Sequence, residues 1–194
     1  MLISWENAKE ILSKNGVVAL PTDTVYGLAA NPFSKKAVQK IYQVKGRSFH
    51  KPLVLMCSNI EQVKDLVANW SDQIEKLVEK YWPGPLTLIF KRNQGKVPKE
   101  VVVNNPTVGI RIPRHEPLLS LLSQLDFPLA VTSANRSGEK ELLLAEEVQE
   151  VFNNKIDGII KDDDSHQGVP STILDVSVDP WEVLREGPIK EWKI

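Results

Sequence analysis

Residues 86–112 read LTLIFKRNQGKVPKEVVVNNPTVGIRI, and this stretch decides the fold class. It contains two short runs of apolar and β-branched residues, Leu86–Phe90 and Val108–Ile112, which predict two β-strands. The polar segment between them shows no helical pattern. A regular βαβ winding would place a helix there, so the stretch predicts a twisted mixed sheet with flanking helices rather than a purely parallel sheet.

Further runs of the same kind extend the predicted sheet. Most of them are bounded by Pro, Gly, Asn or Asp, as strands usually are. These predicted strands are Gly16–Leu20, Leu53–Met56, Leu129–Thr132, Gly158–Ile160, Thr172–Val176 and Glu182–Leu184.

Helical patterns lie between the strands. Ser4, Ser34 and Ser71 are predicted to cap three of the helices, and Ser58 with Glu61 forms a predicted capping box that opens a fourth. The three serine-capped helices are predicted at Trp5–Lys14, Lys35–Lys45 and Asp72–Tyr81, and two more are predicted at Glu116–Gln124 and Ala145–Asn153. No repeat or low-complexity linker divides the sequence, so we expect a single α/β domain over residues 4–190.

The composition excludes several classes of protein. The sequence has 194 residues and a formal net charge of −1, so no bulk charge draws it to nucleic acid or membrane. Its single cysteine, Cys57, follows an apolar run, which indicates a buried thiol and excludes an internal disulfide. The N-terminus lacks the layout of a signal peptide, and no apolar stretch reaches the ~20 residues that span a bilayer. We therefore expect a cytoplasmic protein with no membrane contact.

The charges are unevenly distributed along this nearly neutral sequence. Basic residues dominate residues 24–60 and 91–114, whereas acidic residues dominate from Glu139 onward. Most such charges lie on solvated helix faces. Lys45, Arg47, Lys51 and Arg111 differ, because they lie at the ends of predicted elements, where they could line a site for a polyanion.

Two segments place polar side chains directly after structural elements. Leu20–Leu28 follows a strand and presents two threonines, an aspartate and a tyrosine, which suits either a tight turn or a binding loop. Lys45, Arg47 and Lys51 surround a turn at Gly46, and three converging cations suit a triphosphate. The helix dipole alone would also favour Lys45 at its position.

Two more segments resemble these. Leu129–Gly138 delivers Ser133 and Asn135 after a buried-looking strand, as either a polar turn or a site. A nucleophilic Ser133 is disfavoured, because none of His50, His115 and His166 shows the context of a catalytic triad. The loops at Gly168–Asp175 and Leu184–Gly187 have the same character, and we interpret Asp162–Asp164 as a solvated turn rather than a metal site.

The ordered set of motifs is specific where each motif alone is weak. In chain order they are PTDTVYGL (21–28), KGR (45–47), WPGPLT (82–87), VGIRIP (108–113), TSANRSG (132–138), PSTI (170–173) and LREG (184–187). This set closely resembles the YrdC/TsaC family of threonylcarbamoyl-adenylate synthases, from about Ser4 to Gly187. Beside longer relatives with an extra C-terminal domain, the chain resembles the minimal single-domain form.

The resemblance implies a YrdC-like fold around a large basic cavity and an ATP-dependent reaction. L-threonine and bicarbonate would give N-carboxythreonine, which attacks the α-phosphate of ATP and releases pyrophosphate. Mg²⁺ would be held mainly by phosphates, with no metal site on the protein. The adenylate would pass to transferase proteins that modify tRNA beside the anticodon, and direct tRNA binding stays open.

The resemblance also implies site residues by position in the motifs. Lys45, Arg47, Ser133 and Asn135 correspond to the family's catalytic set. Thr24, Arg111, Ser133 and Ser171 would bind L-threonine, and Arg47, Lys51, Thr107, Asn135 and Arg185 would bind ATP. The chain departs from the family pattern at Ser48–His50, at Met56 in place of a histidine, and at Leu142–Leu144 in place of a polar stretch beside the cavity.

Two alternatives accompany this hypothesis. A non-catalytic protein that binds double-stranded RNA or tRNA would use the same basic stretches. Proteins that bind RNA by base stacking carry exposed aromatic side chains among their basic residues. Here the five tryptophans mostly lie in helix or turn contexts, which disfavours this alternative. A carbamoyl-transfer domain like those of hydrogenase maturation factors would share the fold, but those proteins carry further domains.

Overall fold

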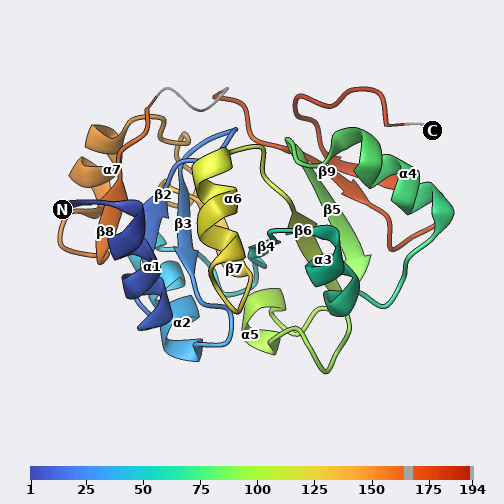
Figure 1. Ribbon diagram of the computed structural model, residues 1–194, viewed down its shortest axis with the longest axis horizontal. Helices are drawn as coiled ribbons and strands as arrows, with labels where there is room; N and C mark the ends of the chain where they lie inside the picture. Colours follow the sequence, from blue (N-terminus) through green and yellow to red (C-terminus); the bar gives the residue numbers. More distant parts are fainter. Residues whose placement is uncertain (164–167, 193–194) are drawn as a thin grey trace.

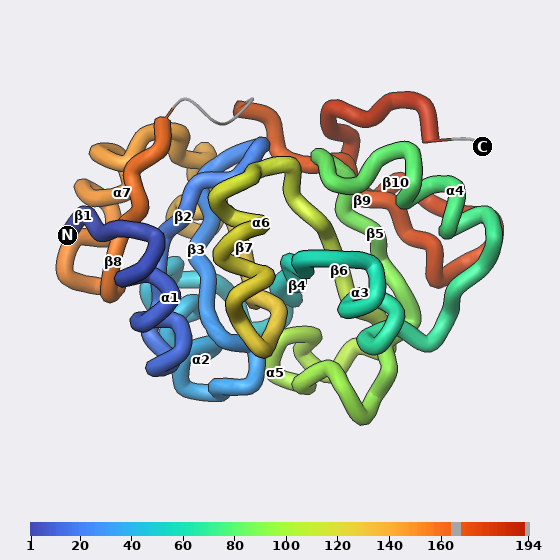
Figure 2. Tube along the Cα trace, viewed as in Figure 1, coloured from blue at the N-terminus to red at the C-terminus, as the bar shows by residue number. Residues whose placement is uncertain are grey.

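The computed structural model describes residues 1–163 and 168–192, and a ten-stranded sheet runs through it in the order β1-β8-β2-β3-β7-β4-β6-β5-β9-β10 (Figure 1). The strands are β1 (Leu2–Ile3), β2 (Val18–Leu20), β3 (Gly27–Ala30), β4 (Val54–Met56), β5 (Leu86–Lys91), β6 (Thr107–Arg111), β7 (Leu129–Ser133), β8 (Gly158–Ile160), β9 (Thr172–Asp175) and β10 (Glu182–Arg185). Figure 2 shows β1 and β10 at opposite ends of the sheet.

Seven helices flank the sheet in the part of the chain that the structure describes. They are α1 (Trp5–Ser13), α2 (Lys35–Lys45), α3 (Ile60–Leu66), α4 (Asp72–Tyr81), α5 (Lys99–Val102), α6 (Glu116–Ser123) and α7 (Ala145–Phe152). The α/β class and the mixed sheet expected from the sequence are therefore confirmed.

The sheet is mixed for the reason that residues 86–112 indicated. Strands β5 and β6 pair antiparallel, with Leu88 opposite Ile110 and Phe90 opposite Val108. By contrast, β4 pairs parallel with β6, and β5 pairs parallel with β9. The connection between β5 and β6 does contain the four-residue helix α5, which the sequence analysis did not expect. One helical turn does not change the antiparallel pairing, which needs no long crossover.

Strand β3 is the main element that the sequence analysis missed. It lies near the middle of the sheet, between β2 and β7, and all four of its residues are buried. Its sequence, GLAA, has little β propensity, so local pattern gave no signal. Small residues fit here because neighbouring chains approach closely: a Cβ on Gly27 would lie 2.7 Å from the side chain of Val131.

The serine caps were predicted correctly, whereas the capping box predicted at Ser58 and Glu61 was wrong. The side chains of Ser4, Ser34 and Ser71 accept bonds from the backbone N–H groups of α1, α2 and α4. In α3 the N-cap is Asn59, whose side chain accepts from the N–H of Gln62. Gln62 Oε1 in turn accepts from the N–H of Ser58. This second bond goes to the residue before the cap, so the pair differs from a capping box, in which it would go to the cap itself.

Helices on both faces bury the sheet. Helices α1 and α6 cover β2, β3 and β7 on one face, where Leu12 and Leu118 pack in one cluster with Leu20 and Val131. Figure 1 shows α6 in front of the central strands, with α1 beside it. Helix α7 covers the opposite face of β2 and β3, and α2 to α5 complete that layer towards β5. These layers leave one part of the α6 face uncovered, beyond the helix, where the cavity lies.

Two further expectations concern single residues. Cys57 is buried, as expected, and its burial raises the pKa of the thiol. Asp163 corrects the interpretation of a solvated turn, because its Oδ1 accepts bonds from the Tyr26 hydroxyl and from Ala145 N at the start of α7. Asp164 and His166 lie outside the described residues. Among the described residues, no helix is both long enough and apolar enough to cross a membrane.

Candidate active site

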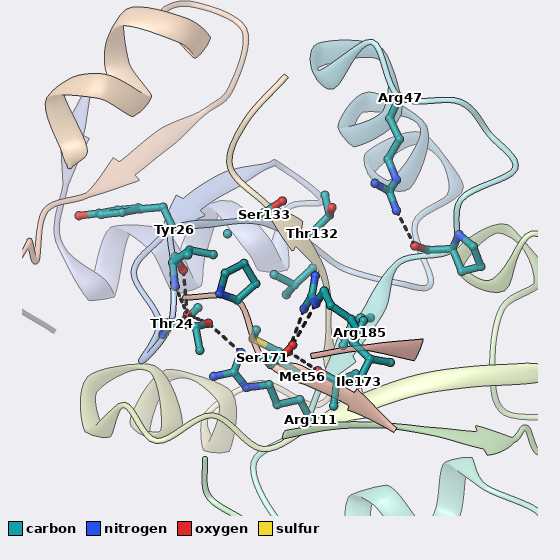
Figure 3. A pocket seen from close by; sticks show the side chains of 18 residues that line it. Thr24, Tyr26, Arg47, Met56, Arg111, Thr132, Ser133, Ser171, Ile173 and Arg185 are labelled. Atoms are coloured by element: carbon teal, nitrogen blue, oxygen red, sulfur yellow. Dashed lines mark hydrogen bonds between the residues drawn. The ribbon is translucent and has the colours of Figure 1, made fainter. Parts of the chain in front are cut away.

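A cavity of about 780 Å³, including its open mouth, lies over one face of the central strands (Figure 3). Its lining includes Val54 and Met56 of β4 and Val131 and Ser133 of β7, and Thr132 between the last two also reaches it. The spacing within each of the two pairs follows from the two-residue period of a strand. Six of the predicted site residues line the cavity: Thr24, Arg47, Arg111, Ser133, Ser171 and Arg185.

Arg111, the last residue of β6, lies almost fully buried at the inner wall of the cavity. Its residue exposure is 3%. Nη2 donates to Asp23 Oδ1 at 2.5 Å, Nη1 to Thr24 Oγ1 at 2.8 Å and Nε to the carbonyl of Gly84 at 3.0 Å. Burial lowers the pKa of Arg111, and the charge of Asp23 opposes that shift. Two of the five N–H donors of the guanidinium are left over, so Arg111 can bind an anion without leaving Asp23.

The loop from Thr22 to Val25 holds Thr24 in a fixed orientation. Thr22 Oγ1 donates to the carbonyl of Val25 at 2.8 Å, which uses the only proton of that hydroxyl. Thr22 Oγ1 also accepts from the N–H groups of Thr24 and Val25, at 3.1 and 3.3 Å, so its proton and both lone pairs are used within the loop. Thr24 Oγ1 lies 3.0 Å from Thr22 Oγ1 and accepts from Arg111 Nη1, and these two partners fix the Thr24 side chain at the cavity wall.

Arg185, at the end of β10, is held by Ser171 at the opposite side of the cavity. Its Nε donates to the carbonyl of Ser171 at 2.9 Å, and its Nη2 donates to Ser171 Oγ at 3.1 Å. Ser171 Oγ lies 2.8 Å from Thr87 Oγ1, a buried hydroxyl of β5. Burial lowers the pKa of Arg185, an effect that Glu141 opposes and Arg111 reinforces.

Arg47 follows the left-handed Gly46 that ends α2, and it reaches the cavity from the outer side. Its Nε and Nη2 donate to the carbonyls of Lys51 and Pro52, at 3.2 and 3.0 Å. Figure 3 shows the Arg47 side chain well separated from Arg111 and Arg185. A positive φ of 59° at Gly46 allows the chain to turn sharply enough to bring Arg47 to this position.

Lys45 is buried behind the cavity and does not line it. Its ammonium donates to the carbonyls of Ser133 and Asn135, at 2.5 and 2.6 Å, and to Asn135 Oδ1 at 2.9 Å. These three acceptors match the three N–H bonds of a charged lysine. Burial, with a smaller contribution from Arg47, lowers the pKa of Lys45 to about 7, while Glu141 opposes the shift. The hydrogen bonds of Lys45 therefore connect the end of α2 to the loop after β7.

Asn135 takes part in the same network of hydrogen bonds. Its Oδ1 also accepts from Ser133 Oγ at 2.7 Å, and its Nδ2 donates to the carbonyl of Glu139 at 2.6 Å. Lys51 and Thr107, like Lys45 and Asn135, are absent from the described lining of the cavity. Of the four residues of the predicted catalytic set, Arg47 and Ser133 reach the cavity, and Lys45 and Asn135 hold Ser133 in place.

Several lining residues were not singled out from the sequence. Thr22 and Thr87 lie inside quoted motifs without an assigned role, and Pro170 and Ile173 flank Ser171. Met56, one of the positions where the sequence departs from the family pattern, also lies in the wall. Alternation along β5 could have placed Thr87 on this face, but its partner Ser171 is 84 residues away in sequence.

Leu142 to Leu144 support α7 instead of lining the described wall. The N–H groups of Leu143 and Leu144 donate to Glu147 Oε2, and the carbonyl of Leu142 accepts from Tyr26 N. A Cβ on Gly168 would lie 3.3 Å from the Leu143 side chain. The apolar stretch therefore packs at the edge of the site, beside the segment that leads to Ser171.

The charged residues among the described lining are three arginines. Asp23 neutralises Arg111 from behind, and Glu141 acts on Arg185 and Lys45 through its charge. No group of three or more His, Cys, Asp or Glu side chains that could hold a metal ion occurs within residues 1–163 and 168–192. The cavity therefore suits an anionic ligand that meets guanidinium groups and hydroxyls.

Comparisons with known proteins agree with the motif set. Residues 10–187 match the model of the Sua5/YciO/YrdC family, which is described as "Telomere recombination". The chain is 37% identical to the threonylcarbamoyl-AMP synthases of Pyrococcus abyssi and Bacillus subtilis, over 95% and 96% of its length. It spans 54% of the length of each of these two relatives.

A solved structure shows the same fold. The crystal structure of P. abyssi Sua5 complexed with L-threonine superimposes with a TM-score of 0.90 at 36% identity, over 94% of this chain and 54% of that one. The family resemblance drawn from the motifs is thus confirmed both by sequence and by structure. The chain belongs to the Sua5/YciO/YrdC family.

Proposed function

We propose that this protein is an L-threonylcarbamoyladenylate synthase, a nucleotidyltransferase that uses L-threonine, bicarbonate and ATP. One observation carries the proposal: three arginines and the hydroxyls of Thr24, Ser133 and Ser171 converge on one cavity. Similarity to proteins named threonylcarbamoyl-AMP synthase, and to one complexed with L-threonine, supports this choice of substrates.

The proposed reaction has two steps. The threonine nitrogen attacks the carbon of bicarbonate, a C–N bond forms, and water leaves to give anionic N-carboxythreonine. A carbamate oxygen then attacks the α-phosphorus of ATP. The bond from that phosphorus to the bridging oxygen breaks, pyrophosphate leaves, and threonylcarbamoyl-AMP forms.

Electrostatic stabilisation is the main task of the protein in this reaction. An anionic nucleophile must approach a triphosphate, and negative charge builds up on the leaving pyrophosphate. Arg47 and Arg185 donate hydrogen bonds only to neutral oxygens among the described residues, so their charges can act on the nucleotide, with that of Arg185 partly offset by Glu141. Such preorganised charges act without a covalent nucleophile. We assign Thr24, Arg111, Ser133 and Ser171 to threonine, and Arg47, Arg185, Lys51, Thr107 and Asn135 to ATP.

Lys45 and Asn135 act in this scheme by holding the loop that carries Ser133. Their bonds join the end of α2 to residues 133–139, and Ser137 N adds a bond to the carbonyl of Lys45 at 3.0 Å. Mg²⁺ arrives as part of the nucleotide substrate, held mainly by phosphate oxygens and water. We further propose a cytoplasmic location, a single functional domain over residues 4–190, and transfer of the product to proteins that modify tRNA.

The decisive assay measures ATP-dependent pyrophosphate release. We expect release only when both L-threonine and bicarbonate are present, with omission of either reducing it to background. Mass spectrometry should detect threonylcarbamoyl-AMP in the same mixture. Tight binding of tRNA without any threonine-dependent release would instead favour a non-catalytic RNA-binding protein.

A further inference from the structure

Thr87 is a buried cavity residue whose hydroxyl has no assigned role. Its exposure is 2%, that of Ser171 is 4%, and their hydroxyl oxygens lie 2.8 Å apart. The methyl group of Thr87 faces β6, since its Cγ2 lies 3.6 Å from the position that a Cβ on Gly109 would take. The hydroxyl is thereby directed towards Ser171.

This hydroxyl pair is not needed to hold the strands together. Strands β5 and β9 already pair through their backbones from Leu86–Thr172 to Ile89–Asp175, and Thr172 N donates to the carbonyl of Pro85. A polar contact that the backbone pairing does not require, placed in the wall of the cavity, points to a role with the ligand.

Counting protons shows what the pair can offer. Arg185 Nη2 occupies one lone pair of Ser171 Oγ, because a guanidinium can only donate. Ser171 and Thr87 then share two hydroxyl protons and one mutual hydrogen bond. One proton is used between them, and one is left to point into the cavity. The pair with Arg185 is therefore a one-proton donor, suited to an acceptor such as a carboxylate.

The two possible directions of the bond differ in strength. When Thr87 donates to Ser171, the Ser171 oxygen accepts from both Thr87 and Arg185, and its own proton becomes a stronger donor through cooperative polarisation. When Ser171 donates to Thr87, the free proton lies on Thr87, which Arg185 polarises only indirectly, through Ser171. A negatively charged acceptor in front of Ser171 selects the first direction.

We propose that Thr87 is a positioning residue that directs the Ser171 hydroxyl proton towards the carboxylate of the amino-acid substrate. This proposal rests on the proposed function only for the identity of the substrate, L-threonine. Thr87 acts through Ser171, and its effect should be specific to threonine rather than to ATP.

The first test compares two substitutions by calorimetric titration of the full chain with L-threonine. Thr87→Val keeps the β-branched shape and removes the hydroxyl, and we expect the Kd for threonine to rise roughly tenfold. Thr87→Ser keeps the hydroxyl and should stay within about threefold of the unchanged protein. Equal weakening by both substitutions, or by neither, would overturn the proposal.

A double-mutant cycle separates this role from a merely structural one. If Thr87 acts through Ser171, then Thr87→Val should cause no further loss of threonine affinity in a Ser171→Ala background. Additive losses would contradict the proposal. The KM for ATP should stay within about twofold in Thr87→Val, because Arg47 bonds other carbonyls and Arg185 keeps its bond to the backbone carbonyl of Ser171. A parallel rise in both KM values would indicate general disruption of the cavity.

Two further measurements identify the hydrogen-bond acceptor and separate the role of Thr87 from the proposed function. The penalty of Thr87→Val should shrink for L-threoninamide, whose neutral amide replaces the carboxylate, and an equal penalty would rule out the carboxylate as the acceptor. If the unchanged protein binds threonine but releases no pyrophosphate, the proposed function fails, while the Thr87 comparison still stands or falls on binding. If it binds no threonine, the role of Thr87 fails as well.

Discussion

Arg111 and Arg185 face the same cavity, yet their charges are treated in opposite ways. Arg111 is buried against the carboxylate of Asp23 and bonds Thr24 as well. Arg185, like Arg47 farther out, is held by carbonyl and hydroxyl oxygens within the described structure. Arg111 has the counter-ion Asp23 within the fold, whereas Arg47 and Arg185 form no ion pair among the described residues and can pair with an anionic ligand. In the proposed mechanism all three arginines bind substrate, Arg111 the threonine and the other two the nucleotide.

The largest effect should come from breaking the completed pair. Asp23→Ala leaves the buried Arg111 guanidinium without its counter-ion, so we expect a loss of about 3–5 kcal/mol in the free energy of unfolding, measured with urea. Asp65→Ala is the matched control, because its ion pair with Lys96 is exposed and should contribute little. Similar losses in the two variants would show that burial does not distinguish the Arg111 pair.

The second effect concerns the uncompensated side. Arg47→Ala should lower pyrophosphate release about 100-fold while leaving the unfolding midpoint unchanged, because the carbonyls it bonds can be satisfied by water. The readout is the initial rate at saturating threonine and bicarbonate. A rate within threefold of the unchanged protein would remove Arg47 from the proposed mechanism.

Lys45 sharpens the comparison, because it is a buried cation bonded to neutral oxygens that can lose its proton. Its pKa is about 7 in the folded state, against the ordinary lysine value of 10.5. Between these values the unfolded chain binds more protons, so stability should rise with pH. From pH 7 to 9 the unchanged protein should gain roughly 2 kcal/mol relative to Lys45→Met. Parallel pH curves for the two proteins would show that Lys45 keeps its proton throughout.

His115 should produce the smallest effect, at the acidic side of neutrality. Its Nδ1 accepts from Leu118 N as the cap of α6, and burial lowers the pKa of this histidine, while Asp162 opposes the shift. The unfolded histidine binds a proton near pH 6.5, so stability should fall as pH drops below that value towards the folded pKa. His115→Asn retains a capping side chain and does not titrate, so it should lose less stability between pH 6.5 and 5. Thermal unfolding across this range decides the point.

The sequence predicted the elements with strong local signals and the residues with strong motifs. Strand β8 and helices α2 and α4 have the predicted bounds, because β-branched runs and serine caps mark them locally. Strand β3 escaped, because Gly and Ala are selected there by close packing that the local sequence does not display. Six predicted site residues line the cavity, since the motifs lie at the ends of neighbouring strands.

The parts that the sequence could not supply depend on distant partners. Lys45 was predicted beside the phosphates, but its ammonium is used by the Ser133 and Asn135 carbonyls, 88 and 90 residues away. The same applies to Thr87 and Ser171, whose pairing depends on β5 and β9 being neighbours. The motifs indicate which residues gather at the site. The fold is needed to show which of them line the cavity and which bond to one another.

The order of strands in the sheet has a consequence for how the chain folds. Strand β8 lies between β1 and β2, and β9 lies beside β5. Both halves of the sheet therefore lack a strand until residues after 157 are present. A nascent chain emerging from the ribosome therefore cannot complete either half until most of its length has been synthesised. Until then β2 and β5 each expose a backbone edge that can pair with a neighbouring chain. The C-terminal third, which brings Ser171 and Arg185 to the cavity, also closes both edges.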